Sequence, residues 1–129
     1  MHRMAIYAIK KDAEKFFNLF EESMSIGQAQ KWLNMSIKYM RMMSVLNKSI
    51  DSEDIHVPVD NYVIDAVKKN GKISELFDVE GLGIEISFNG AWSRINDYNK
   101  YLELQNKIRK KLEERKYIPI DWEAEAWIA

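Results

Sequence analysis

The sequence predicts a compact all-α domain of four or five helices. Apolar residues recur at three- and four-residue steps in several long segments, which is typical of helices that cover a core. The one short stretch that alternates like a strand has no evident partner strand. The chain has 129 residues, a length that suits one core, so we expect residues 1–129 to form a single helical domain.

The first two helices are expected over residues 5–23 and 26–46. The first should cap the core through Ile6, Ile9, Ala13, Phe16, Phe17 and Phe20. Ser25 is available as N-cap of the second helix. Apolar side chains cover more than half of its helical wheel, which predicts a central and mostly buried helix. Its one polar seam, beside Lys31, consists of Asn34, Lys38, Arg41 and Lys48.

The middle of the chain reads as a loop, a short helix and a connector. Residues 47–57 are polar and aperiodic, which indicates a loop. Asp60 is a suitable N-cap for a helix that turns Val63, Ile64 and Val67 inward and stops near Asn70-Gly71. Residues 72–77 are expected to add a helical turn, and residues 81–90 to form an extended connector.

A final long helix is expected from residue 93 or 96 to residue 116. It turns Ile95, Tyr98, Tyr101, Leu102, Gln105, Ile108 and Leu112 to one side. Its basic end suits the negative pole of the helix dipole. After Pro119, residues 121–128 are expected to form one or two closing turns.

Composition excludes several classes of site. The chain has no cysteine, so disulfides, thiolate metal sites and thiol nucleophiles are excluded, and with only two histidines we expect no metal and no cofactor. No apolar run approaches the roughly 20 residues that cross a bilayer, so we expect a cytoplasmic protein without a membrane partner. Familiar phosphate-binding, dinucleotide-binding and nucleophile-elbow motifs are also missing.

Charge is segregated along the chain although the net charge is only −1. Residues 25–48 carry four basic side chains and no acidic one, and residues 49–80 carry eight acidic and three basic side chains. A basic helix therefore precedes an acidic loop and helix. Ordinary surface variation accounts for this pattern, and a phosphate ligand is compatible with it.

Lys31 and Asp60 are the candidate reactive pair. Lys31 lies among apolar neighbours near the start of one helix, and Asp60 begins the next helix 29 residues later. Successive helices often run antiparallel, so the two side chains could share a cleft. A lysine in a poorly hydrated pocket is held closer to neutral and can form a Schiff base, and a nearby carboxylate can accept its proton.

Two strings around this pair resemble the catalytic core of the helix-hairpin-helix DNA glycosylases, most closely the archaeal 8-oxoguanine branch. They are QKWLNMSIKYM at residues 30–40 and HVPVDNYV at residues 56–63, and the resemblance spans about residues 25–67. It implies a trimmed core of that fold. Lys31 would attack the anomeric carbon and cleave the strand through an imine while Asp60 assists, so the partner would be DNA or a base or nucleotide ligand.

The resemblance also suggests which residues contact the substrate. Met35 lies four residues after the lysine, where the archaeal branch places an aromatic that stacks on the extruded base. The other candidates are Trp32 for stacking, Lys38 and Arg41 for phosphates, and His56 as a proton shuttle. The glycine-rich hairpin of the family is reduced here to residues 25–27, which weakens phosphate binding more than it weakens the reactive pair.

Structural interpretations of these residues stay open. Lys31 also fits an edge lysine whose stem packs on the core, and Asp60 fits a plain helix cap. His56 fits an ordinary loop histidine. Lys38 and Arg41 fit a basic seam that faces solvent. The alternative function is a non-catalytic module that binds a nucleotide or a partner, for example a viral or bacterial sequestering protein. A third possibility is an interaction domain whose methionine- and tryptophan-rich surface forms an oligomer.

Overall fold

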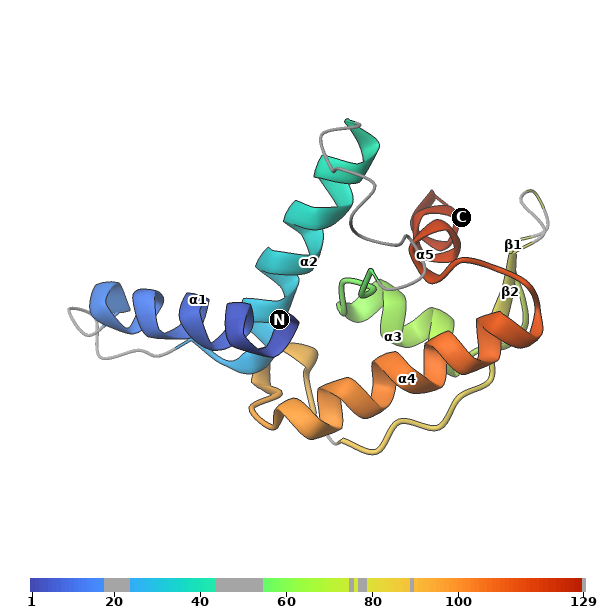
Figure 1. Cartoon of the computed structure of the whole chain (residues 1–129). Coiled ribbons are helices and arrows are strands. Elements are labelled where there is room, and N and C mark those ends of the chain that lie inside the picture. The colour runs from blue at the N-terminus through green and yellow to red at the C-terminus, as the bar shows by residue number, and fades with distance from the viewer. Residues whose placement is uncertain (18–23, 44–54, 75, 77–78, 89, 129) are drawn as a thin grey trace.

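The chain forms a mostly helical fold with one small hairpin (Figure 1). The computed structural model describes residues 1–17, 24–43, 55–74, 76, 79–88 and 90–128. The helices are α1 (His2–Phe17), α2 (Ile26–Met42), α3 (Asn61–Lys68), the 3-10 helix η3 (Trp92–Arg94), α4 (Tyr98–Glu114) and α5 (Pro119–Ile128), and the strands are β1 (Asn70–Ser74) and β2 (Val79–Leu82). The helical class is confirmed, and the strictly all-α prediction is wrong.

The hairpin replaces the helical turn predicted over residues 72–77 and the first part of the connector predicted over residues 81–90. β1 pairs with β2 in antiparallel register, with Asn70 opposite Leu82. Gly71 has a φ of 95°, which side chains rarely adopt, and a Cβ on Gly81 would lie 2.1 Å from the Lys69 carbonyl oxygen. Val79 and Leu82 are buried, so the sheet closes one side of the core.

The core lies between α2, α3, α4, α5 and the hairpin. Most side chains that periodicity turns inward are buried there, which confirms the predicted faces of α3 and α4; the buried members include Ile26, Val63, Val67, Tyr101, Ile108, Leu112 and Trp122. α5 begins at Pro119 itself, a favourable first helical residue, and is longer than the closing turns expected.

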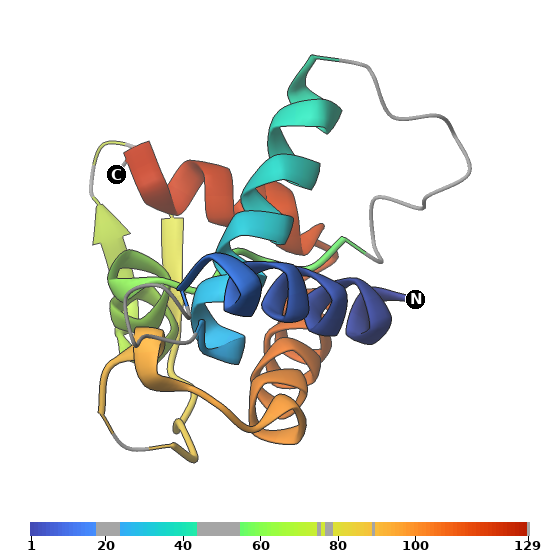
Figure 2. The same ribbon diagram turned by 90° about the vertical axis from the view of Figure 1, so that its left-hand side faces the viewer.

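α1 crosses the first turns of α2 (Figure 2). It begins at His2, before the predicted start, and Ile6 is fully buried, as a cap on the core requires. The predicted end of this helix at residue 23 lies outside the described residues, as does Phe20. The predicted end of the second helix at residue 46, Lys48 and the loop at residues 47–54 also lie outside them.

α2 buries much of its polar seam, whereas only Ile26 and Ala29 of the described apolar arc are buried. Its buried side chains include the polar set Gln30, Asn34 and Lys38, whereas Trp32, Tyr39, Met42 and Met43 are exposed. The prediction of a buried apolar arc with a solvated polar seam is therefore wrong. The polar side chains are buried because partners on other elements satisfy each of them.

The start of α2 is fixed by a capping box and a close contact. The Ser25 hydroxyl accepts a hydrogen bond from the Gln28 amide, and the Gln28 side chain accepts one from the Ser25 amide. The Gly27 amide donates to the Ile95 carbonyl at 2.8 Å, and a Cβ on Gly27 would lie 1.9 Å from the Trp92 carbonyl oxygen. Only glycine fits here, so this contact sets the position of Lys31 one turn later.

Candidate functional site

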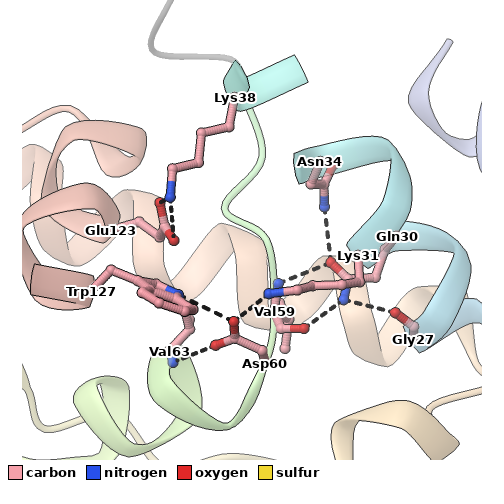
Figure 3. Close-up of polar contacts among 10 residues, drawn as sticks. All are labelled: Gly27, Gln30, Lys31, Asn34, Lys38, Val59, Asp60, Val63, Glu123 and Trp127. Carbon is pink, nitrogen blue, oxygen red and sulfur yellow. Dashed lines mark hydrogen bonds and ion pairs between the residues drawn. The ribbon is translucent and has the colours of Figure 1, made fainter. Parts of the chain in front are cut away.

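Lys31 and Asp60 meet, as the sequence predicted. The Lys31 amine forms an ion pair with Oδ2 of Asp60 between α2 and the first residue before α3 (Figure 3). The Lys31 side chain is 21% exposed and that of Asp60 8% exposed. The lysine side chain is therefore partly accessible, while the carboxylate is largely shielded from water.

Three donors hold the Asp60 carboxylate. Its Oδ1 accepts the Val63 amide at 2.9 Å, which makes Asp60 the N-cap of α3, as expected. Its Oδ2 accepts the Lys31 amine and also the indole N–H of Trp127 at 3.3 Å. Capping therefore uses only one oxygen, and the other faces α2 and α5.

Gln30 joins α2 to the segment that carries Asp60. Its side-chain nitrogen donates to the Val59 carbonyl at 2.8 Å, and its side-chain oxygen accepts the Val59 amide at 3.0 Å. The same nitrogen donates to the Gly27 carbonyl. Gln30 and Val59 directly precede Lys31 and Asp60, so this fully buried amide fixes the separation of Lys31 from Asp60. The sequence analysis missed Gln30, because no helical pattern identifies a buried amide.

A second pair, between Lys38 and Glu123, lies farther along α2. The Lys38 amine lies 2.8 Å from Oε2 and 3.1 Å from Oε1 of a fully buried Glu123 (Figure 3). Burial raises the pKa of the Glu123 carboxyl above its ordinary value, and the contact with Lys38 opposes that rise. Lys38 is thus committed to α5 and is not a free phosphate contact.

Two cavities flank Trp127 at the end of α5. One of about 410 Å³ is lined by Met35, Lys38, Tyr39, Met42, Ala124, Glu125, Trp127 and Ile128. The other, of about 360 Å³, is lined by Tyr62, Asp65, Ala66, Lys69, Ile73, Ala126, Trp127 and Ile128. Met35 and Lys38 therefore line the cavity whose wall includes Trp127, and the Trp127 indole also contacts Asp60. The sequence alone did not single out Trp127.

The remaining predicted contacts are placed less favourably. Trp32 is 64% exposed and lines neither cavity. Arg41 pairs with Asp121 at 2.8 Å, at the surface between α2 and α5. Trp32 and Arg41 could therefore contact only a ligand that extends beyond these two cavities.

His56 belongs to a separate cluster of polar rings. Its Nδ1 lies 2.7 Å from the Tyr101 hydroxyl, and its ring stacks on that of His2 with centroids 3.8 Å apart. The Tyr101 hydroxyl also accepts from the Asn34 amide. Burial, reinforced by the nearby charges of His2 and Arg109, lowers the pKa of His56 to about 3. His56 therefore lies away from both cavities and braces the segment before Asp60.

No metal-binding group stands out in the described part of the chain. Among these residues, no three His, Cys, Asp or Glu side chains gather closely enough to hold an ion. Over the same residues, no helix combines the length and the apolar character needed to span a membrane.

Comparison with protein-family models, curated proteins and solved structures produced no match. The geometry of this chain and the two strings around Lys31 and Asp60 are therefore its indications of function.

Proposed function

We propose that the protein is a DNA glycosylase/lyase that removes a modified purine of the 8-oxoguanine type through a Schiff base on Lys31. The observation that carries the proposal is the ion pair of Lys31 with Asp60, which joins residues 29 apart in sequence. An amine and a carboxylate in contact, partly shielded from water, suit nucleophilic catalysis by lysine.

The contact between Lys31 and Asp60 suits a separate role for each in the proposed reaction. The Lys31 ammonium must lose a proton before it attacks, and Asp60 Oδ2 is the acceptor in contact with it. The free amine then attacks the anomeric carbon, the bond to the base breaks, and the sugar ring opens as the imine forms. The base leaves with the electron pair of the broken bond and takes the proton from Asp60, and the carboxylate restored in this way stabilises the positive charge of the imine.

The larger cavity is the candidate site for the extruded base. Its volume of about 410 Å³ lies within the range of small-ligand pockets. Met35 and Trp127 supply a thioether and an aromatic wall, between which a flat base can stack. Neither Lys31 nor Asp60 lines this cavity, but Met35 lies one helical turn after Lys31 and the Trp127 indole contacts Asp60, so the cavity adjoins the pair.

Borohydride trapping tests the proposal. Borohydride reduces an imine to a stable secondary amine, so the wild-type protein should crosslink to DNA that contains 8-oxoguanine or an abasic site. Lys31→Gln should give no adduct, and Lys68→Gln, which removes an exposed lysine on α3, should crosslink like the wild type. Absence of a wild-type adduct, or an equal adduct with Lys31→Gln, would contradict the proposal.

One observation favours a non-catalytic ligand-binding module as the second candidate. The Lys31 amine is occupied by Asp60, and an ammonium held in an ion pair is not a nucleophile. Titration with 8-oxoguanosine and with oligonucleotides, followed by calorimetry, separates the two functions. Binding that Trp127→Ala abolishes, without any trapped adduct, would support the module, and absence of binding to any of these probes would exclude it.

A further inference from the structure

The hydrogen bond from Trp127 to Asp60 is not needed for capping or for the ion pair. Val63 already caps through Oδ1 and Lys31 pairs through Oδ2, yet the Trp127 indole also donates to Oδ2. Figure 3 shows the indole between the two lysine–carboxylate pairs, with its N–H directed at Asp60. A donor from α5 therefore reaches an oxygen that already has a partner.

Trp127 is held in this place from two sides. The Tyr62 ring, two residues after Asp60, packs against the indole with centroids 4.7 Å apart and a 38° tilt. The Lys38 amine lies 6.0 Å from the indole centroid on the side of α2. Trp127 is nevertheless 43% exposed and Tyr62 62% exposed, so burial does not account for the arrangement.

Trp122, on the same helix, is a tryptophan with a structural role. It is 2% exposed, and its indole donates to the Glu80 backbone carbonyl at 3.1 Å, which ties α5 to the hairpin. Trp127 differs, because it is partly exposed, donates to a side chain and lines both cavities.

We propose that Trp127 is a positioning residue that keeps the Asp60 carboxylate oriented once Lys31 leaves it to react, with Tyr62 as the brace of the indole. A carboxylate held only through Oδ1 can rotate about its Cβ–Cγ bond, whereas a second donor on Oδ2 fixes its plane. The reactive step rests on the proposed function, but the orientation of the carboxylate is a property of the free protein.

Indole NMR tests the orientation without any substrate. The 1H–15N resonance of the Trp127 indole should move strongly in Asp60→Asn and stay near its wild-type position in Lys31→Met, because the acceptor survives there. The Trp122 indole resonance should stay constant in both variants. Tyr62→Ala should move the Trp127 resonance and Tyr62→Phe should not. A Trp127 resonance that ignores Asp60→Asn would overturn the proposal, whatever the activity.

Trapping kinetics test the consequence for the reaction. Trp127→Phe keeps an aromatic ring and loses the N–H, so imine formation should slow by about 10- to 100-fold while the DNA dissociation constant changes less than about twofold. Trp122→Phe removes the other α5 indole N–H and should react at the wild-type rate. A wild-type rate in Trp127→Phe would refute the reactive role. If the wild type forms no adduct, the proposed function fails, and NMR alone decides the positioning role.

Discussion

Helix α2 carries two lysines two turns apart, and each pairs with a carboxylate from another element. The side chains of the Lys38–Glu123 pair are 11% and 0% exposed, and both Glu123 oxygens contact the one amine. The side chains of the Lys31–Asp60 pair are 21% and 8% exposed, and Asp60 keeps two further donors. We call Lys38–Glu123 the sealed pair, because it is buried and fixes α5 on α2. We call Lys31–Asp60 the open pair, because its ion pair can break while Asp60 keeps two other hydrogen-bond donors.

Breaking the sealed pair should have the largest effect on stability. Glu123→Gln leaves the Lys38 ammonium buried without a counter-charge, which should lower the free energy of unfolding by about 3–5 kcal/mol. Urea denaturation monitored by circular dichroism measures the loss. The double variant Lys38→Met with Glu123→Leu should recover most of it, because it removes both charges together. A loss below about 1 kcal/mol in Glu123→Gln would show that the pair is not sealed.

Removing the amide that aligns the open pair should cost less. Gln30→Ala leaves the buried amide and carbonyl of Val59 without partners, so we expect a loss of about 1–3 kcal/mol. Hydrogen exchange at the Val59 amide should accelerate at the same time. The matched control is Gln28→Ala, which removes an exposed capping glutamine in the same helix and should leave that exchange unchanged. Unchanged exchange in Gln30→Ala would contradict the aligning role.

Acid should lower the free energy of unfolding, because the ring cluster beside the segment that carries Asp60 contains two buried histidines. Burial lowers the pKa of His2, and it lowers that of His56 from 6.5 to about 3. Below about pH 6.5 the unfolded chain therefore binds protons that the folded chain does not, so stability falls by on the order of 1 kcal/mol per pH unit for His56, and protonation of His2 adds to the loss. Glu123 acts in the opposite direction. Its raised pKa means that the folded chain binds a proton before the unfolded chain does, so protonation of Glu123 adds stability as pH falls.

Urea midpoints at pH 7, 6 and 5 isolate the histidine contribution when the wild type is compared with His56→Asn. The wild type should lose more stability over this range than the variant does, because the variant has one group fewer to protonate. Parallel pH curves for the two proteins would show that the ring cluster does not carry the dependence.

Removing the amine of the open pair should have the smallest effect on stability. Lys31→Met should cost less than about 1 kcal/mol, because the amine is partly exposed and Asp60 retains Val63 and Trp127 as donors. Urea denaturation beside Lys38→Met makes the comparison direct. A loss in Lys31→Met as large as that in Lys38→Met would mean that both pairs are structural.

Much of the helical framework could be predicted from sequence, because it depends on local signals. Asp60 caps α3 and Ser25 caps α2 at the predicted positions, and the buried face of α4 follows its apolar spacing. The meeting of Lys31 with Asp60 was also predicted, from residue types and from the resemblance of the surrounding strings.

The features that sequence reasoning missed depend on long-range partners. Periodicity defines the two faces of α2, but the face that turns inward is decided by Glu123, Tyr101 and Val59, which lie on other elements. The hairpin was missed because β1 is short and carries only Ile73 as a large apolar residue, so that its pairing with β2 leaves no strong pattern. Trp127 contacts Asp60 across 67 positions, a separation that no local pattern reports.

Peptide mapping of the borohydride-trapped adduct tests the central claim most directly. After proteolysis of wild-type protein crosslinked to abasic DNA, mass spectrometry should locate the reduced sugar adduct on Lys31, the amine of the open pair. An adduct on Lys38 or on the N-terminal amine of Met1, with Lys31 unmodified, would contradict the account.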